Sequence, residues 1–266
     1  MKGMFKKEFL EARGKLIWGL VVFCLLAIGI PLLYPLVVSL TLAPVPSDAL
    51  STPRSGISVA MPGEILKEIE RMRRDFDYYL WSQWAGKNLP QAGGVLAIIL
   101  GMGAVANEYK RKTALFLLAR PVSRAGILGS KFAAAIISLA VVIFVSTLVM
   151  LTAARPAGYH FAWGTQLATA VPSFAGAVLI FAVTAFFSSF SPGALPAALG
   201  GFGATVCSIL TPYFFKSNTL NILFHMAGVR FFQEGIFPWP FIFASFVLTG
   251  VFYFLALLIF SRREVL

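Results

Sequence analysis

Residue types that commonly carry out chemistry are scarce and scattered in this chain. The histidines, His160 and His225, are isolated, and the cysteines, Cys24 and Cys207, lie deep in apolar stretches. A zinc site needs three or four such ligands close together, so we expect no metal site. The segment Gly126–Lys131 has only a faint likeness to a P-loop, because the spacing of its glycines and lysine is wrong. We therefore expect no catalytic residues.

One segment, residues 107–131, has a composition that suits binding to another protein. It carries six lysine or arginine residues and one acidic residue. Four consecutive large apolar residues stand in its middle, and a water-facing loop rarely exposes such a run without a partner to cover it. The residues expected to dock a partner are Glu108, Lys110, Arg111, Lys112, Leu115, Phe116, Leu117, Leu118, Arg120, Pro121, Ser123 and Arg124. The alternative is a basic loop that folds back on the membrane.

The segments that flank this loop are predicted to span a membrane. The chain has 266 residues, 58% of them hydrophobic and 12% charged, whereas soluble domains have about 25% charged residues. A spanning helix needs about 20 apolar residues, and Ser191–Pro196 divides the longest uncharged stretch. We expect an all-α membrane protein, residues 1–266 forming one transmembrane domain. The six predicted spans are residues 17–42, 89–106, 130–153, 167–190, 194–214 and 241–260.

The first apolar stretch is too long for the core of a signal peptide, so we expect it to be retained as a helix. Pro31 and Pro35 are expected either to kink this helix or to mark where it leaves the bilayer. The basic residues 1–16 before it suit an amphipathic helix at the interface, with Phe5, Phe9 and Arg13 among its contacts. A frayed, charged start is the alternative.

The distribution of charge predicts the orientation in the membrane. The net charge is +11, and nine of these charges lie in residues 1–16, the 107–131 loop and residues 262–264. Six spans place these segments on one side, and an excess of lysine and arginine marks the cytoplasmic side. We therefore expect both termini in the cytoplasm. The positive charge then reflects topology, and no nucleic-acid partner is expected.

Two segments on the opposite side are predicted to contain further helices. In the outer loop 44–88, a helix is expected to begin at Pro62 and end at Gly86. Opposite charges four residues apart should pair along it, at Glu70/Arg74, Arg71/Asp75 and Arg73/Asp77. A contact with substrate is the less favoured role for this helix. The aromatic residues 213–240 suit short re-entrant or interfacial helices.

Small residues in two of the spans are predicted to allow close helix packing. They are Gly93, Gly94, Gly101 and Gly103 in the second span and Gly200, Gly201 and Gly203 in the fifth. The centres of the spans contain no Asp, Glu, Lys or Arg. Ion-coupled pumps and proton relays usually place ionisable groups there, so this composition weighs against a carrier or channel.

Together these features resemble the type-2 ABC permeases, the membrane subunits of ABC exporters. In that family the second span is followed by Glu, Gly/Lys-Thr, two leucines, Pro-x-Ser-Arg, and a Gly-x-Lys that opens the third span. The matching residues are Glu108, Lys112-Thr113, Leu117-Leu118, Pro121–Arg124 and Gly129–Lys131, with Lys112 where the family often has glycine. The ending Phe260–Val265 is similar to the family's aromatic-x-Arg-Arg-acid close.

The resemblance implies a function and a set of partners. Two permease subunits, identical or different, would pair in a bacterial or archaeal cytoplasmic membrane above two separate ABC ATPase subunits. The 107–131 loop would supply the coupling helix, and the first, second and fifth spans would line the pathway. ATP and Mg²⁺ would bind to the partner subunit and no cofactor to this chain, which would not itself be an enzyme.

Two other classes of function stay open from the sequence. The chain could be an ATP-independent scaffold or immunity-type membrane protein, or an ATP-independent channel or carrier. Uncharged, aromatic-rich spans favour an amphipathic or lipid-like cargo over a bare ion. The complex could also pass mechanical work to another protein without translocating a substrate. An adjacent reading frame for an ATPase with a Walker A motif would favour the exporter.

Overall fold

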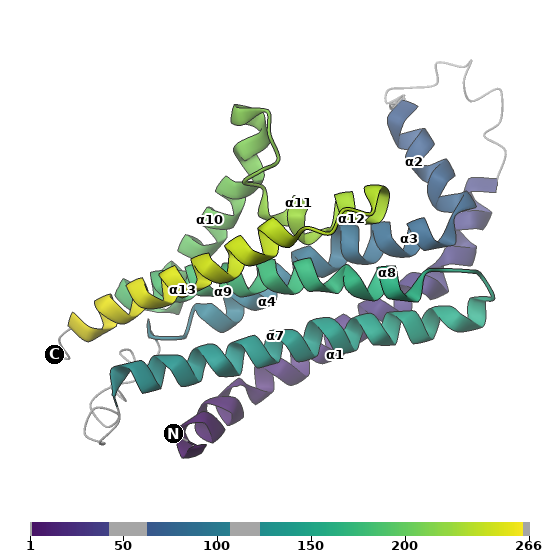
Figure 1. Ribbon diagram of the computed structural model, residues 1–266. Coiled ribbons are helices and arrows are strands. Elements are labelled where there is room, and N and C mark those ends of the chain that lie inside the picture. The colour runs from purple at the N-terminus through teal and green to yellow at the C-terminus, as the bar shows by residue number, and fades with distance from the viewer. Residues whose placement is uncertain (1, 43–62, 107–122, 263–266) are drawn as a thin grey trace, which may run out of the picture.

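The computed structural model describes residues 2–42, 63–106 and 123–262, and the regular elements in these ranges are all helices (Figure 1). Five helical segments are long and apolar enough to cross a membrane. They contain α1 (Lys2–Leu42), α7 (Arg124–Ala154), α9 (Ala170–Phe190), α10 (Ala194–Phe215) and α13 (Trp239–Arg262). The prediction of an all-α membrane protein is confirmed, and the break between α9 and α10 falls where the Ser191–Pro196 segment predicted it.

The helix α9 lies at the centre of the bundle. It packs against α4 (Leu89–Gly101), α7, α10 and α13. In the segment Trp163–Phe190, which contains α9, 72% of the most apolar 18-residue stretch is buried, against 11% in α10. Fully buried alanines at 175, 177, 182 and 185 let these neighbours approach closely. The helix α1 packs along α7, while α10 leans away from the bundle (Figure 1).

The start of the chain and the first predicted span form one helix. No break occurs near residue 16, and α1 continues through Pro31 and Pro35 to Leu42. A proline inside a helix removes one backbone hydrogen bond. Near these prolines, two tyrosine hydroxyls tie neighbouring segments together. Tyr79 donates to the Ile30 carbonyl at 3.0 Å, and Tyr34 donates to the Arg73 carbonyl at 2.9 Å.

The second predicted span differs most from expectation. The helix α4 has 13 residues and rises about 20 Å, less than the roughly 30 Å hydrocarbon core of a bilayer. Residues 102–105 form a turn instead of continuing it. On its other side, α4 follows α3 (Phe76–Gln83) and a π-helical turn, η2 (Trp84–Asn88), so that residues 76–101 are helical throughout. The six-span count is therefore not confirmed.

Polar side chains stabilise the π-helical turn. The side-chain amide of Asn88 donates to the carbonyl of Gln83 at 2.7 Å, and the indole of Trp84 donates to the hydroxyl of Thr147 on α7 at 3.0 Å. Trp84 is among the largest fully buried side chains in the described part of the chain. A sequence periodicity of 3.6 residues does not reveal such a turn, and hence the predicted helix end at Gly86 is wrong.

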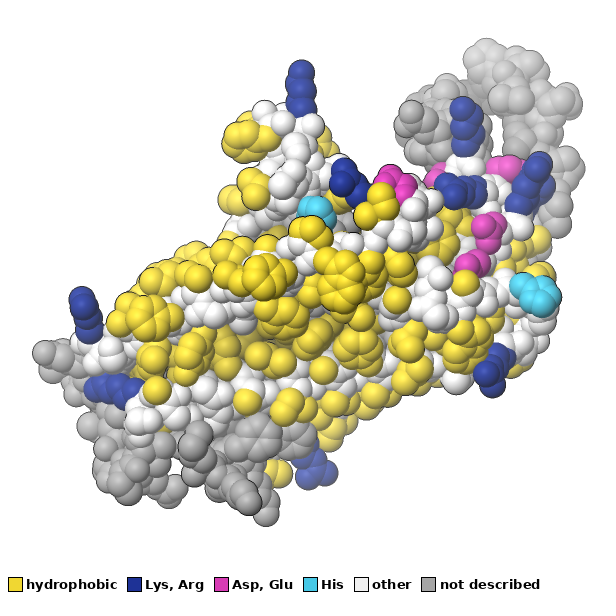
Figure 2. All heavy atoms as spheres, viewed as in Figure 1, with side chains coloured by type: hydrophobic (Ala, Val, Ile, Leu, Met, Phe, Trp, Pro, Cys, Tyr) yellow, Lys and Arg dark blue, Asp and Glu magenta, His cyan; other side chains and the backbone are white. Residues whose placement is uncertain are grey.

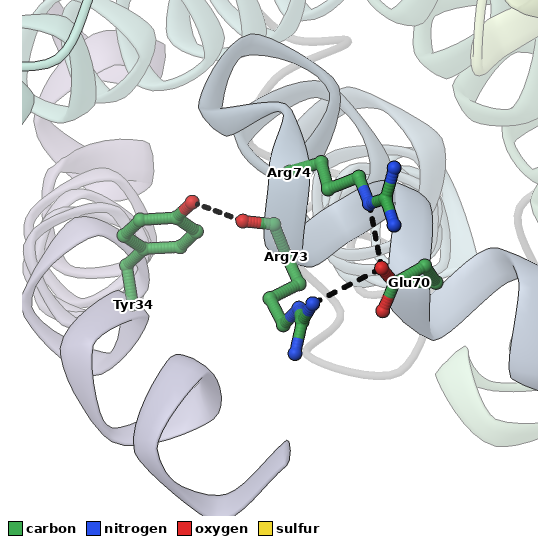
Figure 3. A network of polar contacts seen from close by, with 4 residues as sticks. All are labelled: Tyr34, Glu70, Arg73 and Arg74. Carbon is green, nitrogen blue, oxygen red and sulfur yellow. Dashed lines mark hydrogen bonds and ion pairs between the residues drawn. The ribbon is translucent and has the colours of Figure 1, made fainter. Parts of the chain in front are cut away.

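The predicted helix from Pro62 to Gly86 is also interrupted in its middle. The helix α2 (Gly63–Arg74) ends before Asp75, whose carboxylate caps α3 by accepting from the Tyr78 amide at 3.0 Å. Of the predicted charge pairs, Glu70–Arg74 forms at 2.6 Å, and Glu70 also pairs with Arg73 at 3.1 Å (Figure 3). The bond from Arg74 holds the pKa of the Glu70 carboxyl below its usual value.

The described part of the chain also contains four short helical elements: η3 (Arg155–Ala157), α8 (Trp163–Ala168), α11 (Ile222–Met226) and α12 (Val229–Glu234). Short helices were predicted for residues 213–240, and α11 and α12 lie in this range, between α10 and α13. Trp81 of α3 stacks on Phe232 of α12 with ring centroids 4.6 Å apart. Its indole donates to the Ala227 carbonyl at 3.0 Å, so α11 and α12 are tied to α3.

The two ends of the bundle differ in charge. We call the end where α1 begins and α13 ends the termini end, and the opposite end, which carries α2 and α3, the α2 end (Figure 1). On the visible face, hydrophobic side chains cover the middle of the molecule, and the acidic side chains gather towards the α2 end (Figure 2). This pattern is typical of a bundle whose middle lies in a bilayer.

Candidate functional site

The loop predicted to dock a partner lies between α4 and α7 in the sequence, and the start of α7 lies at the termini end (Figure 1). Most of its predicted docking residues, from Glu108 to Pro121, lie outside the described residues, so their docking role stays a prediction. The structure does describe Ser123, Arg124 and the chain on both sides of the gap. It therefore shows how each end of the loop is fixed to the bundle.

The downstream end of the loop is fixed to α7 and α13. Ser123 caps α7 by accepting from the Gly126 amide at 3.1 Å. The Arg124 guanidinium donates to the carbonyls of Phe260 and Ser261, at 2.5 and 2.9 Å. A cation at the last carbonyls of a helix is stabilised by the negative end of the helix dipole. Arg124 thus binds α13 within the chain, a contact that its predicted role in partner docking did not include.

Replacing Arg124 with methionine is expected to lower the free energy of unfolding by about 1–3 kcal/mol, because two charge-assisted hydrogen bonds to the last carbonyls of α13 are lost. Arg262 is exposed in the same terminal region of α13. Arg262→Met serves as the control, with an expected change within about 0.5 kcal/mol. Denaturation of the purified protein measures both. Equal losses in the two variants would contradict the Arg124 contact.

The upstream end of the loop is fixed to α9 and α1. The buried Ser188 hydroxyl of α9 accepts from the amides of Val105 and Ala106, both at 3.0 Å, and donates to the Met102 carbonyl at 3.0 Å. Near the end of α4, the ammonium of Lys15 donates to the carbonyl of Ile99 at 2.8 Å. Sequence reasoning missed Ser188, since a serine in an apolar span gives no signal for a contact between helices.

Three of the predicted glycines lie against α9. A Cβ atom on Gly101 would stand 2.7 Å from the Thr184 Cβ, and one on Gly201 would stand 2.1 Å from the Thr184 hydroxyl oxygen. A Cβ on Gly200 would stand 2.6 Å from the ring of Phe187. These distances are shorter than any real contact, so α4 and α10 approach α9 only because these positions have no side chain.

The other predicted glycines have more space around them, and the residues predicted for the interfacial helix lie on α1. A Cβ on Gly93 or Gly94 would make ordinary contacts with α7 or α9, and one on Gly203 would meet no atom within 4 Å. Gly103 lies in the turn after α4. Arg13 is exposed on α1. The backbones of Phe5 and Phe9 belong to α1, and their side chains lie outside what the structure describes.

A polar contact at the α2 end also escaped the sequence analysis. The Gln166 side-chain amide of α8 donates to both the carbonyl and the carboxylate of Asp77, each at 2.8 Å, and the Ala162 amide donates to that carboxylate at 3.2 Å. Asp77 thus joins α3 to α8, where a pair with Arg73 was predicted. Asp75 likewise caps α3, where a pair with Arg71 was predicted.

Two titratable groups, Tyr78 of α3 and His225 of α11, are partly shielded from water. Burial and a hydrogen bond to Glu68 raise the pKa of Tyr78 to about 12, and the Arg71 guanidinium lies 4.0 Å from the Tyr78 ring centroid. Burial lowers the pKa of His225, which stacks on Phe241. Among the described residues, no group of three His, Cys, Asp or Glu is placed to hold a metal ion. The contacts of Ser188 and Arg124 anchor the ends of the loop, and Gly101, Gly200 and Gly201 allow close helix packing.

Comparison with known protein families finds a match over most of the chain. The family described as ABC-2 family transporter protein matches residues 4–222, from α1 to the start of α11 and across the whole 107–131 loop. A comparison with curated proteins gives no match. A family match over most of the chain, on a bundle of membrane-spanning helices, shows that the chain belongs to the ABC-2 family of transporter proteins.

Proposed function

We propose that the chain is the membrane-spanning permease subunit of an ATP-driven exporter. ATP hydrolysis takes place on a separate ATPase subunit, to which ATP and Mg²⁺ bind. The observation that carries the proposal is the anchoring of the 107–131 loop, whose two ends are fixed at one end of the bundle through Ser188 and Arg124. A loop fixed in this way transmits a force to the bundle, whereas a loosely attached loop would absorb it.

The loop is proposed to contain the coupling helix. Leu115, Phe116, Leu117 and Leu118 fill an apolar groove of the ATPase, since buried large apolar groups supply most of the energy of an interface. The surrounding lysines and arginines set the register against acidic rims. Arg124 contributes indirectly, because its guanidinium is bound to α13.

Two permease subunits are proposed to form the pathway, with two ATPase subunits below them. The helices assigned to the pathway are α1, α4 and α10, the counterparts of the first, second and fifth predicted spans. Large apolar residues on α1 and α10 are exposed in the single chain, among them Trp18 at 72% and Leu195 at 72%. Such surfaces suit contact with lipid and with a second permease subunit.

The second of six spans is proposed to consist of α4 together with the adjoining π-helical turn and the 102–106 turn. This topology places both termini and the 107–131 loop in the cytoplasm of a bacterium or archaeon, and the α2 end on the outer side. The charge distribution supports it, since nine of the eleven net charges then lie in the cytoplasm.

Cysteine labelling tests this topology. In a chain whose Cys24 and Cys207 are replaced by alanine, an impermeant maleimide is expected to label Ser217→Cys in intact cells. Ser261→Cys should react only after the membrane is opened. Both side chains are exposed, so access depends on the side of the membrane. Labelling of Ser261→Cys from outside would contradict the proposed topology.

A further inference from the structure

The turn that follows α4 has an unusual pattern of hydrogen bonds. In a continued α-helix, the Ala106 amide would donate to the Met102 carbonyl, four residues earlier. Instead the Ser188 hydroxyl lies between these two groups, accepting from the Ala106 amide at 3.0 Å and donating to the Met102 carbonyl at 3.0 Å. One side chain of α9 thus takes the place of a backbone hydrogen bond in an opened helical turn.

Burial makes this contact hard to replace. Val105, Ala106 and Ser188 are buried, and buried backbone amides need a hydrogen-bond acceptor. Two other buried hydroxyls, those of Ser146 and Thr184, donate to carbonyls three or four residues earlier in their own helices. Insertion of a side chain into the helical hydrogen-bond ladder is a known cause of helix bending.

The helices on either side of the turn are closely packed. One residue before it, Gly101 lies so close to α9 that a Cβ there would stand 2.9 Å from the Phe181 carbonyl oxygen. The same α9 residue that crowds Gly101, Thr184, lies against Gly201 of α10. The helices α4, α9 and α10 are therefore in close contact directly beside the 102–105 turn.

We propose that Ser188 holds the 102–105 turn open as a hinge, and that it is the positioning residue through which movement of the docking loop reaches α9. The turn has two hydrogen-bonded arrangements. In the open one, Ser188 is inserted; in the closed one, Ala106 bonds to Met102 and α4 gains a turn. Ser188 shifts the population towards the open arrangement. The inference rests on the proposed function, because it takes the loop to be moved by an ATPase.

The experiment compares the parent chain with Ser188→Ala, Ser188→Thr and Ser146→Ala, each purified with the ATPase subunit. Ser146 is the matched control, since it is equally buried and bonds only within α7. Hydrogen exchange of the Val105 and Ala106 amides reports on the turn. A pull-down reports on ATPase binding, and the hydrolysis rate with and without the permease reports on coupling.

In Ser188→Ala, the open arrangement leaves these two amides without an acceptor, so their exchange is expected to become about tenfold faster, the factor that loss of one hydrogen bond produces. The ATPase should bind as to the parent, while its stimulation by the permease falls by a similar factor. Ser188→Thr, which keeps the hydroxyl, should restore both values, and Ser146→Ala should alter neither.

Unchanged exchange in Ser188→Ala would overturn the hinge. If exchange changes in Ser188→Ala but the variant stimulates hydrolysis as strongly as the parent does, the positioning role would be overturned. A parent chain that binds no ATPase would overturn the proposed function and the positioning role with it, whereas the exchange comparison would still decide whether Ser188 holds the turn.

Discussion

Replacing Phe116 and Leu117 together with alanine is expected to release the ATPase subunit from the permease. Hot spots of protein interfaces are buried aromatic and large apolar side chains, and truncation of such a cluster costs about 2–4 kcal/mol. Each 1.4 kcal/mol weakens binding about tenfold, so the dissociation constant should rise by roughly 30- to 1,000-fold. Pull-down of the ATPase and its hydrolysis rate measure the loss.

The matched control for this variant is Phe214→Ala with Phe215→Ala. These two adjacent aromatic residues are 78% and 70% exposed at the far end of α10, on the side opposite the loop. Their truncation removes a similar apolar area and should leave ATPase binding unchanged. If the Phe116/Leu117 variant binds and stimulates the ATPase like the parent, the loop does not contain the coupling helix.

The replacement of Gly201 with alanine is expected to separate α10 from α9. The added Cβ would stand 2.1 Å from the Thr184 hydroxyl oxygen and 2.8 Å from the Thr184 Cβ, so one helix must shift. Inserting a methyl group into such a packed contact costs about 1–3 kcal/mol. Denaturation of the purified protein should show this loss of stability, and stimulation of the ATPase should fall with it.

Gly203 provides the control, because a Cβ at that position of the same helix meets no atom within 4 Å. Gly203→Ala should be neutral or slightly stabilising, since alanine favours helix more than glycine does. Adding Thr184→Ala to Gly201→Ala removes the closest clashing atom and should recover part of the stability. Equal effects of the two glycine substitutions would show that the contact between α9 and α10 is not tight.

The long helices were predictable because their signal is simple. Uncharged stretches of about 20 residues mark spans whatever their packing, and the Ser191–Pro196 break located the boundary between α9 and α10. The family was also readable from the motif around residues 108–131, and the match over residues 4–222 confirms it. The close approach of α4 and α10 to α9 involves Gly101 and Gly201, both singled out as small residues.

The second span and the 102–105 turn were not predictable, because tertiary contacts decide them. Hydropathy does not distinguish a continuous helix from one that contains a π-helical turn held by Asn88 and Trp84. It also does not reveal a hydroxyl on α9 that replaces a backbone bond 82 residues away, as Ser188 does for Ala106. The charge pairs at Asp75 and Asp77 were mispredicted since capping α3 and joining α8 satisfy these carboxylates with directed hydrogen bonds.

The most direct test of the proposed function is purification of the tagged chain from its native membranes, followed by ATP photolabelling of the proteins that accompany it. A separate subunit that binds ATP should copurify, its hydrolysis should depend on the permease, and the Phe116/Leu117 double variant should lose it. Purification of the chain without any ATP-binding subunit, from membranes in which it is folded and intact, would contradict the exporter and favour an ATP-independent scaffold or channel.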